Sequence, residues 1–434
     1  MAVLTLPYLG GGANMSLRLW RSGEYWSGRK LKIAFLACAL ILAGCGTSSS
    51  AAKPAASTST TTAASSQSPY VVHAILSLTG PGATLGSIAS HALTAFAAYV
   101  NHSGGIDGHP ITLDIVNNQS NPATAVSQAT NLIHSGVPFL LNGSISPVDN
   151  AVDALAGSTG PVIYDLSPVA NPKPHSYVFA AGISTKYLEG SIVNFMKVSG
   201  YNRIAIINSS DASGLDGYNE LEAALKSPIG SGVTVISHQT YDPTALNVVP
   251  QMSAIKATNP QAIFISTTGT PFGTVLRAMS SLGMTNVPTF ATSGNALQSE
   301  LTSLSSILPA HLYLPLGPLY FSPSSLPTPL QSYLSVFDKI VTAAGGQPNT
   351  GWGLPVDAFM IMVRALKALG VKATAPQLKN YLQTKVKNVP ESFGLYNISA
   401  QNHVGTSGSD VWIGQWNGKS FSIVSGKDGT TVAK

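Results

Sequence analysis

Between residues 70 and 283, short apolar runs alternate with longer amphipathic segments. Apolar strands separated by helices are typical of a parallel β-sheet that is covered on both faces. The alternation forms two series, each long enough to build one sheet, so we predict an α/β protein with two lobes. The first series has expected strands at 70–78, 111–118, 137–143 and 161–167, and helices at 85–104, 122–136 and 147–157. The second has expected strands at 203–209, 233–239 and 262–268, and helices at 186–199, 214–226, 247–257 and 271–283.

The alternation loosens after residue 314. A Pro-rich stretch at 314–329 precedes three expected helices, at 330–345, 356–369 and 376–385. Residues 410–426 alternate apolar and polar side chains around Asn417-Gly418, a dipeptide that favours the tight turn of a β-hairpin. We therefore expect the chain to end in a hairpin.

The charge of the chain is low and unevenly placed. Charged residues make up 9 % of the sequence and hydrophobic residues 44 %, which allows a sizeable core. The formal net charge is +5, of which +4 belongs to residues 1–44. The remaining 18 basic and 17 acidic residues provide no basic face, so we expect no nucleic-acid partner.

The N-terminal residues have the pattern of an export signal. A positively charged segment at 18–32 precedes twelve apolar or small residues at 33–44, too few to span a membrane. The run ends in Leu-Ala-Gly-Cys45, which resembles the lipobox of bacterial lipoproteins, where the cysteine is lipidated and begins the mature chain. An ordinary secretory signal with a chance cysteine is the alternative. We predict a signal peptide at 1–44, with Met15 as an alternative start.

Residues 46–69 are rich in Ser, Thr and Ala and have little to bury, which predicts a flexible tether over 45–69 behind lipidated Cys45. The other cysteine, Cys38, would leave with the signal peptide. No thiol would then remain for a disulfide, a metal ligand or a nucleophile.

Catalytic motifs are missing from the sequence. The stretch "GPGATLG" at 80–86 is one residue too long for a dinucleotide-binding G-x-G-x-x-G, and no Walker A lysine, H-E-x-x-H or G-x-S-x-G occurs. The nine histidines are scattered. We therefore expect no enzyme activity, no cofactor and no metal.

Several stretches, taken together and in order, resemble the branched-chain amino-acid-binding type of solute receptor of ABC transporters. They are "LSLTGPGATLG", "VNHSGGIDGHPITLDIVNNQSNPATAVSQATNLI", "LLNGSISPVDNAVDALAGSTGPVIYDLSPVANP", "YNRIAIINSSDASGLDGYNEL", "NPQAIFISTTGTPFGTVLRAMSSLGM" and "IGQWNGKSF", and the match covers 70–434. The resemblance implies a type I periplasmic-binding-protein fold, in which two lobes are joined by three hinge crossings. Lobe 1 would comprise 70–187 and 315–394, and lobe 2 would comprise 188–314 and 395–434.

The function that the resemblance implies is capture of a small polar molecule between the lobes, an amino acid, amide or organic acid, and delivery to an ABC permease. The protein would be exported as a monomer and anchored by the lipid on Cys45 to the outer face of the bacterial cell membrane. A ligand sensor of the same fold that signals to a membrane partner is the alternative, and a secreted hydrolase with a cryptic site is a third. Permease and ATPase genes beside this gene would favour transport, and a kinase gene would favour sensing.

Ligand contacts are expected where the parallel strands end, because a sheet of this kind opens its binding crevice at the carboxyl ends of its strands. Helices that begin there aim backbone N–H groups at a ligand. The resemblance places a ligand-carboxylate contact at Ser146, although any such Ser or Thr can instead cap a helix or form a turn. The candidate residues are Thr79, Gly80, Leu85, Ser144, Ile145, Ser146, Ser167, Val169, Ala170, Ser213, Thr268, Gly269 and Ser293.

Departures from the family pattern bear on the ligand. Amino-acid receptors of this family place an acid in lobe 2 to pair with the ligand ammonium, and here that place holds Ser293 or Gly294. Burying an ammonium without an anion is costly. Asp211 is the one acid nearby, and it can simply face solvent. A neutral or anionic ligand therefore fits at least as well as an amino acid.

Aromatic residues that line the family's cleft are also replaced. Leu85, Ser213 and Thr268 stand at aromatic positions, and Ala170 stands where a threonine is usual or the threonine is deleted. Trp352 either approaches the cleft or packs in the core. For Trp412 and Trp416 on the expected hairpin we predict packing.

Overall fold

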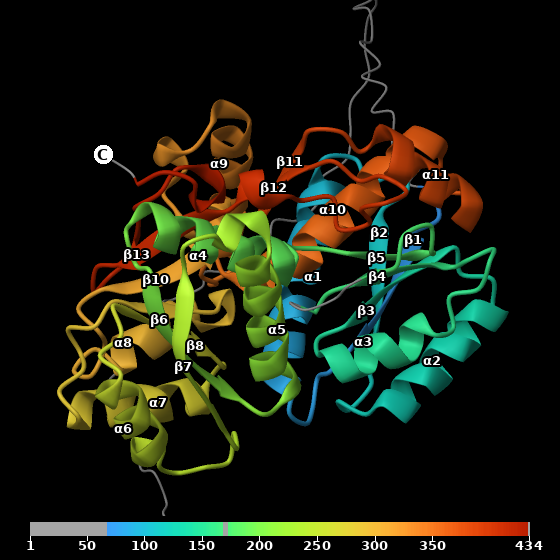
Figure 1. Ribbon diagram of the computed structural model, residues 1–434. Helices are drawn as coiled ribbons and strands as arrows, with labels where there is room; N and C mark the ends of the chain where they lie inside the picture. The colour runs from blue at the N-terminus through green and yellow to red at the C-terminus, as the bar shows by residue number, and fades with distance from the viewer. Residues whose placement is uncertain (1–66, 168–171, 433–434) are drawn as a thin grey trace, which may run out of the picture. The chain divides into compact units, whose positions relative to one another are not determined.

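The computed structural model describes residues 67–167 and 172–432. The predicted signal peptide, Cys45, most of the tether, and the candidate residues Val169 and Ala170 lie outside the described residues. The described chain builds two sheets with helices packed on them, which confirms the predicted α/β architecture (Figure 1). The five-stranded sheet and its helices form the first lobe, and the seven-stranded sheet and its helices form the second lobe.

The sheet of the first lobe is parallel throughout, in the order β2-β1-β3-β4-β5. Ile75, Leu140 and Ile163 pack with two helices on one face, and their neighbours Leu76 and Leu141 pack into the larger core on the other. The strands are β1 Tyr70–Leu76, β2 Ile111–Asn117, β3 Phe139–Gly143, β4 Val162–Asp165 and β5 Val178–Ala180. The helices are α1 Ala83–His102, α2 Pro122–His134, α3 Ser146–Asp153, α10 Thr350–Leu369 and α11 Ala375–Lys385, with α9 Thr328–Ala343 against α1.

The sheet of the second lobe has the order β14-β13-β10-β9-β8-β6-β7. The five strands from β10 to β7 are parallel, and the predicted hairpin adds β13 and β14 as antiparallel strands at one edge. The strands are β6 Arg203–Ser209, β7 Thr234–Tyr241, β8 Ala262–Ser266, β9 Thr289–Ala291, β10 Leu312–Leu316, β13 Trp412–Trp416 and β14 Phe421–Ile423. The helices are α4 Thr185–Val198, α5 Ala212–Lys226, α6 Val249–Ala257, α7 Thr270–Ser281 and α8 Gln298–Ser303.

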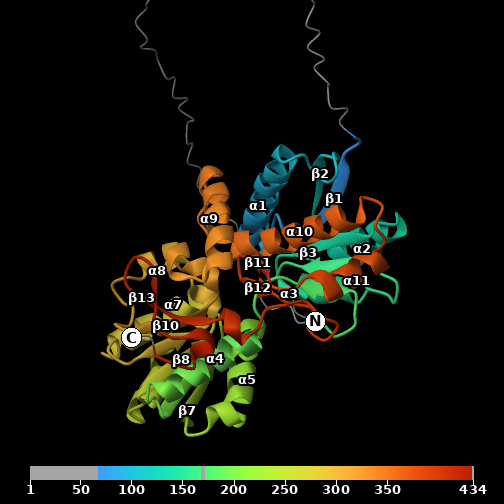
Figure 2. The ribbon, with the colours of Figure 1, turned by 90° about the horizontal axis from the view of Figure 1, so that it is seen from above.

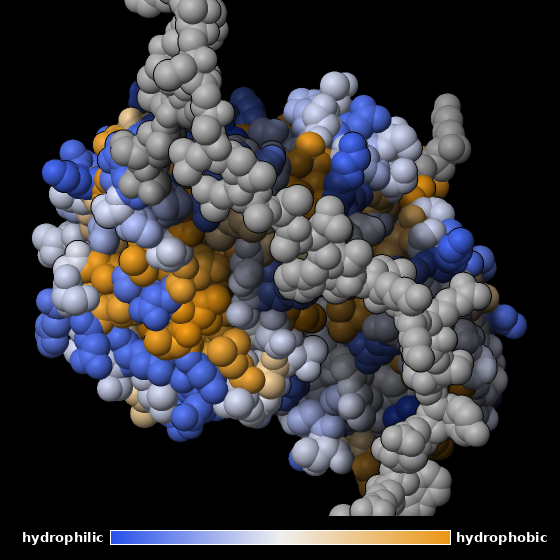
Figure 3. Space-filling model, turned by 180° about the vertical axis from the view of Figure 1, so that it is seen from behind, coloured by the Kyte–Doolittle hydropathy of each residue, from blue (hydrophilic) through white to orange (hydrophobic). Residues whose placement is uncertain are grey.

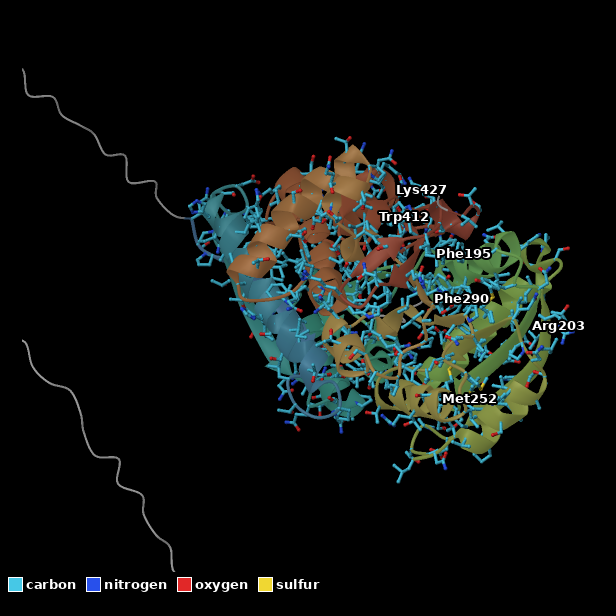
Figure 4. The ribbon with its side chains drawn as sticks, turned by 90° about the vertical axis from the view of Figure 1, so that its left-hand side faces the viewer. Phe195, Arg203, Met252, Phe290, Trp412 and Lys427 are labelled. Carbon is cyan, nitrogen blue, oxygen red and sulfur yellow. The ribbon has the colours of Figure 1, made fainter. Side chains whose placement is uncertain are left out.

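Each face of this second sheet has its own packing. Phe195 of α4 and Phe290 of β9 meet edge to face, with ring centroids 6.2 Å apart, while Met252 of α6 is buried on the opposite face (Figure 4). The Lys427 ammonium lies 5.8 Å from the ring centroid of Trp412. Trp412 and Trp416 are both buried against phenylalanine rings, as predicted.

One helix of the described chain, α1, is long and apolar enough to cross a membrane by length and composition. It packs against α10, β2 and α9, and Figure 2 shows α1 and α9 next to each other at the rear of the molecule. Seen from behind, the surface has orange hydrophobic areas between hydrophilic ones (Figure 3). Exposed large apolar side chains, such as Tyr99 of α1 and Val336 of α9, are distributed over several elements. The contacts of α1 are therefore those of a helix in a packed lobe.

The chain passes between the two sheets three times. It leaves the first sheet after β5 to reach β6, returns after β10, and passes again to β13 by way of a crossing that includes the small hairpin of β11 Val389–Glu391 and β12 Gly394–Tyr396. These crossings touch one another at Gly317. A Cβ added there would lie 3.0 Å from the Ile183 side chain and 3.3 Å from the Phe393 ring. The exact lobe boundaries, at 187/188, 314/315 and 394/395, stay a prediction.

Asp357 of α10 is fully buried and organises two of these crossings. Its carboxylate accepts the backbone N–H groups of Ser392 (2.9 Å) and Phe393 (3.2 Å) and the Tyr396 hydroxyl (2.8 Å). The Tyr396 oxygen in turn accepts the N–H of Gly182, at 2.9 Å, on the first crossing. Burial raises the pKa of Asp357 to about 7, although these hydrogen bonds oppose the rise.

We predict that Asp357→Asn flattens the pH dependence of folding stability. The folded chain holds a proton on Asp357 more tightly than the unfolded chain does, so this group makes stability fall as pH rises from about 4 to about 7. The fall is up to about 4 kcal/mol, at roughly 1.4 kcal/mol for each pKa unit. Urea unfolding at pH 4.5, 6 and 7.5 measures it, with Asp107→Asn in an exposed turn as the control. Equal slopes for Asp357→Asn and the wild type would contradict this role.

Candidate ligand-binding site

The first candidate loop follows β1 and is held by the loop after β2. The Asn117 amide donates to the Thr79 hydroxyl at 3.0 Å, and the Ser120 hydroxyl donates to the Thr79 carbonyl at 2.7 Å. Gly80 has φ +83°, and a Cβ there would lie 2.9 Å from the Gln119 carbonyl oxygen. Thr79 and Gly80 are both exposed at the end of the strand, where a ligand can reach them.

Helix α1 begins close above this strand end. A Cβ on Gly86 would lie 2.1 Å from the Ser77 carbonyl oxygen, so only glycine lets the helix approach. The approach brings Leu85 to the edge of a small cavity of about 10 Å³, room for about one water molecule.

Buried Ser144 lines the same cavity, with its backbone at φ +147° and its hydroxyl accepting the Ser77 N–H at 3.3 Å. The sequence did not indicate that α10 would also contribute to it. The first turns of α10 supply Thr350, Gly351, Leu354 and Pro355 to the wall of this cavity. Ala89 and Leu166 complete its lining.

Ser146 and Ser167 come together although 21 positions separate them. Their hydroxyl oxygens are 2.9 Å apart, and either can donate to the other. Ile145, in extended conformation, precedes α3 and packs against the smaller core of the first lobe. Ser146 therefore stands at the N-terminus of α3, half-buried, at the carboxyl end of β3.

A cluster of carboxyl groups lies beneath these serines, and the sequence reasoning missed it. Asp149 and Asp153 of α3 and Asp165 of β4 are close enough to perturb one another, and the amide of Asn142 donates to Asp165 at 3.1 Å. Burial raises the pKa values of Asp149 and Asp165 well above the usual range, and that of Asp153 to about 6. A Cβ on Gly143 would lie 1.7 Å from an Asp149 oxygen, so glycine is required above the cluster.

In the second lobe, Ser213 and Thr268 are brought together from the ends of β6 and β8. Their hydroxyl oxygens are 3.5 Å apart, and Ser213 also donates to Asp211 at 3.1 Å. Asp211 does not simply face solvent. It is half-buried and caps α5 by accepting the Gly214 N–H at 3.3 Å, with a further bond from the Ser209 hydroxyl. Its carboxylate is therefore already engaged by the protein.

The last two candidates of this lobe lie at the ends of β8 and β9. Gly269 precedes α7 with φ +67°, and Ser293 opens a short 3-10 helix, Ser293–Asn295. A Cβ on Gly294 would lie 2.7 Å from the Thr268 methyl group, so this loop and that of Thr268 are in contact. The half-site of the second lobe is thus lined by hydroxyl groups and backbone.

In both half-sites, a glycine in the first turn of a helix lets that helix pack closely against the end of a strand. As α1 passes over the end of β1 at Gly86, so α5 passes over the end of β6 at Gly214, where a Cβ would lie 2.3 Å from the Ser209 carbonyl oxygen. The serine hydroxyl at each strand end also bonds to a neighbouring loop: Ser77 donates to Asn118, and Ser209, whose own proton goes to Asp211, accepts from the Thr267 hydroxyl at 2.8 Å. Glycine at these positions lets the first turn of the helix lie against the strand end.

Trp352 packs in the core of the first lobe. It is 3 % exposed, and its ring centroid lies 5.2 Å from that of His91 on α1.

Of the described residues, no group of three or more His, Cys, Asp or Glu side chains could hold a metal ion. The arrangement is suited to hydrogen bonding of a ligand.

The comparisons with known proteins agree with this architecture. Among curated proteins, none matches the sequence significantly. Solved structures do match, among them an extracellular ligand-binding receptor from Rhodopseudomonas palustris HaA2, with 21 % identity, a TM-score of 0.69 and coverage of 82 % of this chain and 100 % of that one.

Two further structures were solved with ligands. The branched-chain amino acid transporter substrate binding protein LivJ from Streptococcus pneumoniae, in complex with isoleucine, has 16 % identity and a TM-score of 0.66 over 82 % of this chain and 98 % of its own. A solute binding protein of an ABC transporter from Rhodopseudomonas palustris BisB5, in complex with 3,4-dihydroxy benzoic acid, has 15 % identity and a TM-score of 0.64 over 82 % and 96 %. At these identities the likeness shows a shared fold.

The family assignment comes from the sequence itself. Residues 69–421 match the family described as periplasmic binding protein, which accounts for most of the chain and nearly all of its described part. Members of this family bind solutes and are not enzymes, in agreement with the expectation from the sequence. The chain belongs to the periplasmic binding protein family.

Proposed function

We propose that the protein is an extracytoplasmic solute receptor that captures a small polar molecule between its two lobes and delivers it to an ABC permease. The observation that carries the proposal is the matched pair of strand-end sites. The first lobe gathers Ser144, Ser146 and Ser167, and the second gathers Ser213 and Thr268. Helices α3 and α5, which begin at these sites, both lie toward the middle of Figure 1, one in each lobe.

Three crossings that touch at Gly317 support a hinge between the half-sites. A ligand bound to one half-site would then be enclosed by the other as the lobes close, which is a common mode of domain closure around a ligand. The proposed moving bodies are 70–187 with 315–394, and 188–314 with 395–434.

For the ligand we propose a neutral or anionic molecule with an apolar part. The Asp211 carboxylate is engaged by Ser213 and by the start of α5, and the loop around Ser293 carries no acid that would pair with an ammonium. Leu85 and Leu166 present aliphatic surface beside the serines of the first lobe. Organic acids and amides satisfy both conditions.

The proposed anchor is a lipid on Cys45. The apolar run at 33–44, the small residues before the cysteine and the Ser/Thr/Ala-rich tether behind it support this assignment. The tether would let the receptor reach a permease in the same membrane.

We predict that one class of small molecule raises the melting temperature of the full chain. A ligand at a hundred times its dissociation constant adds about 2.7 kcal/mol to the free energy of unfolding. The panel contains L-isoleucine, L-isoleucinamide, 3,4-dihydroxybenzoate, 3,4-dihydroxybenzamide and urea, each measured by thermal shift. No response to any small molecule, together with a response to a protein partner, would count against transport.

Ser146→Ala is expected to weaken a ligand found in this way about tenfold or more. A hydrogen bond to a charged group contributes about 1.5–3 kcal/mol, and the variant removes one such donor. Isothermal titration measures the dissociation constant, and Ser135→Ala, at an exposed helix end, is the matched control. Unchanged affinity in Ser146→Ala would remove Ser146 from the site.

Cys45→Ser is expected to release the protein from the membrane. Without the thiol no lipid can be attached, and the described part of the chain offers no comparable anchor, since α1 is packed within the first lobe. Fractionation of cells that produce the variant measures the membrane-bound share, with Cys38→Ser as the control. Retention of the Cys45→Ser protein in the membrane fraction, as in the wild type, would disprove the anchor.

A further inference from the structure

The strands of the first sheet are parallel, so they all begin at one edge, which we call the entry edge, opposite the ends that carry the candidate ligand loops. The strands are entered through residues 67–70, 101–111, 131–139, 154–162 and 172–178. Helix α11 crosses two of these entries (Figure 1). A Cβ on Gly160, before β4, would lie 2.4 Å from the Ala375 side chain, and the Lys379 ammonium donates to the His175 carbonyl before β5, at 2.7 Å. Residues 367–379, from the last turn of α10 into α11, therefore also belong to the entry edge.

The fold gathers positive charge at the entry edge, which the composition of the chain did not predict. Its only acid among the described residues is Asp107, and the remaining described residues hold more acidic than basic side chains. The ion pairs found within the described chain lie elsewhere, so no acid neutralises the lysines of this edge. One of these lysines is half-buried and three are exposed; the four are Lys379, Lys173, Lys367 and Lys372.

Apolar side chains stand between two of these lysines. Residues 367–372 read Lys-Ala-Leu-Gly-Val-Lys, and in this segment Ala368 is exposed and Leu369 is 40 % exposed. An apolar tip flanked by cations suits a membrane interface, where apolar side chains enter the acyl boundary and ammonium groups reach the headgroups. Members of this family act outside the cytoplasm, so a lipid surface is favoured over a nucleic acid as the anionic partner.

The chain also enters the first lobe at this edge. The His109 ring donates to the Ser68 carbonyl at 2.8 Å, and the Tyr70 N–H donates to the Pro110 carbonyl at 2.8 Å. The segment between Cys45 and residue 67, as the flexible tether that the sequence predicts, spans about 26 Å on average. A folded unit of the described size is about 50 Å across. A lipid on Cys45 therefore holds the entry edge nearer to the membrane than the cleft.

We propose that the entry edge of the first lobe is a docking surface for the anionic lipid surface of the membrane that anchors the protein. The four lysines face the headgroups, and Leu369 enters the interface. The cleft, at the other end of the strands, then opens away from the membrane and is free to load its ligand. The assignment rests on the proposed lipid anchor at Cys45.

The experiment follows a fluorescent label on the full lipidated chain in vesicles. Cys38 leaves with the signal peptide and Cys45 carries the lipid, so the cysteine of Leu369→Cys takes an environment-sensitive dye alone. We expect its emission to shift to the blue in vesicles of equal parts phosphatidylcholine and phosphatidylglycerol, and not in phosphatidylcholine alone. Leu246→Cys, at a side chain 95 % exposed on the second lobe, is the control and should show no shift in either.

Charge variants of the labelled chain test the lysines. Lys367→Gln with Lys372→Gln should lower the ratio of docked to undocked label about 25-fold, because each lysine near an anionic surface contributes about fivefold. Raising the salt concentration to 1 M should have a similar effect, since the Debye length falls to about 3 Å. Lys197→Gln with Lys419→Gln, both exposed on the second lobe, is the matched control and should leave the ratio unchanged. Melting temperatures confirm that each variant is folded.

The outcomes separate this inference from the proposed function. A chain that floats with the vesicles but gives the same emission at positions 369 and 246, or a shift that is indifferent to lipid charge, overturns the docking surface and leaves the anchor and the receptor standing. A shift at position 369 that requires an added membrane protein assigns the edge to a protein partner and also overturns it. Failure of the anchor is seen separately, because the Cys45→Ser protein would then stay in the membrane fraction.

Discussion

The buried carboxylate of Asp357 joins α10 of the first lobe to the chain segments that pass between the two lobes. It accepts two successive backbone N–H groups of the third crossing and the hydroxyl of Tyr396, whose oxygen accepts the N–H of Gly182 on the first crossing. The Asp357 side chain therefore links two chain crossings to α10, a helix that packs in the first lobe.

Strand and helix order could be predicted because apolar runs and amphipathic periods are local signals. The strand predicted at 203–209 is the observed β6, and the predicted helices differ from the observed ones mostly at their ends. The helix predicted to begin at 356 begins at Thr350 in the structure. The prediction missed its first turns because they contain Gly351, Gly353 and Pro355, residue types that are unfavourable within helices. Asn349, which caps it by accepting the Trp352 N–H, is the signal that could have found the start. Strands of three residues, such as β5 and β9, are too short to show a period.

The pairing of side chains between strand ends could not be predicted in this way. Nothing local joins Ser146 to Ser167, or Ser213 to Thr268, until the sheets bring them together. The cluster of Asp149, Asp153 and Asp165 was hidden for the same reason. Separate aspartates in a helix and a strand indicate solvated positions until their common face is known. What could be predicted was the set of loops, since every strand of a parallel sheet ends at one edge.

A cleft of this kind can choose its ligand without an ion pair. The charged group closest to the half-site of the second lobe, Asp211, is engaged by the protein's own hydroxyl and backbone groups. The half-site of the first lobe has hydroxyls whose donor direction is unspecified by their own chemistry. A hydroxyl surface can accept or donate, so it discriminates only when a neighbouring group fixes the direction of its protons.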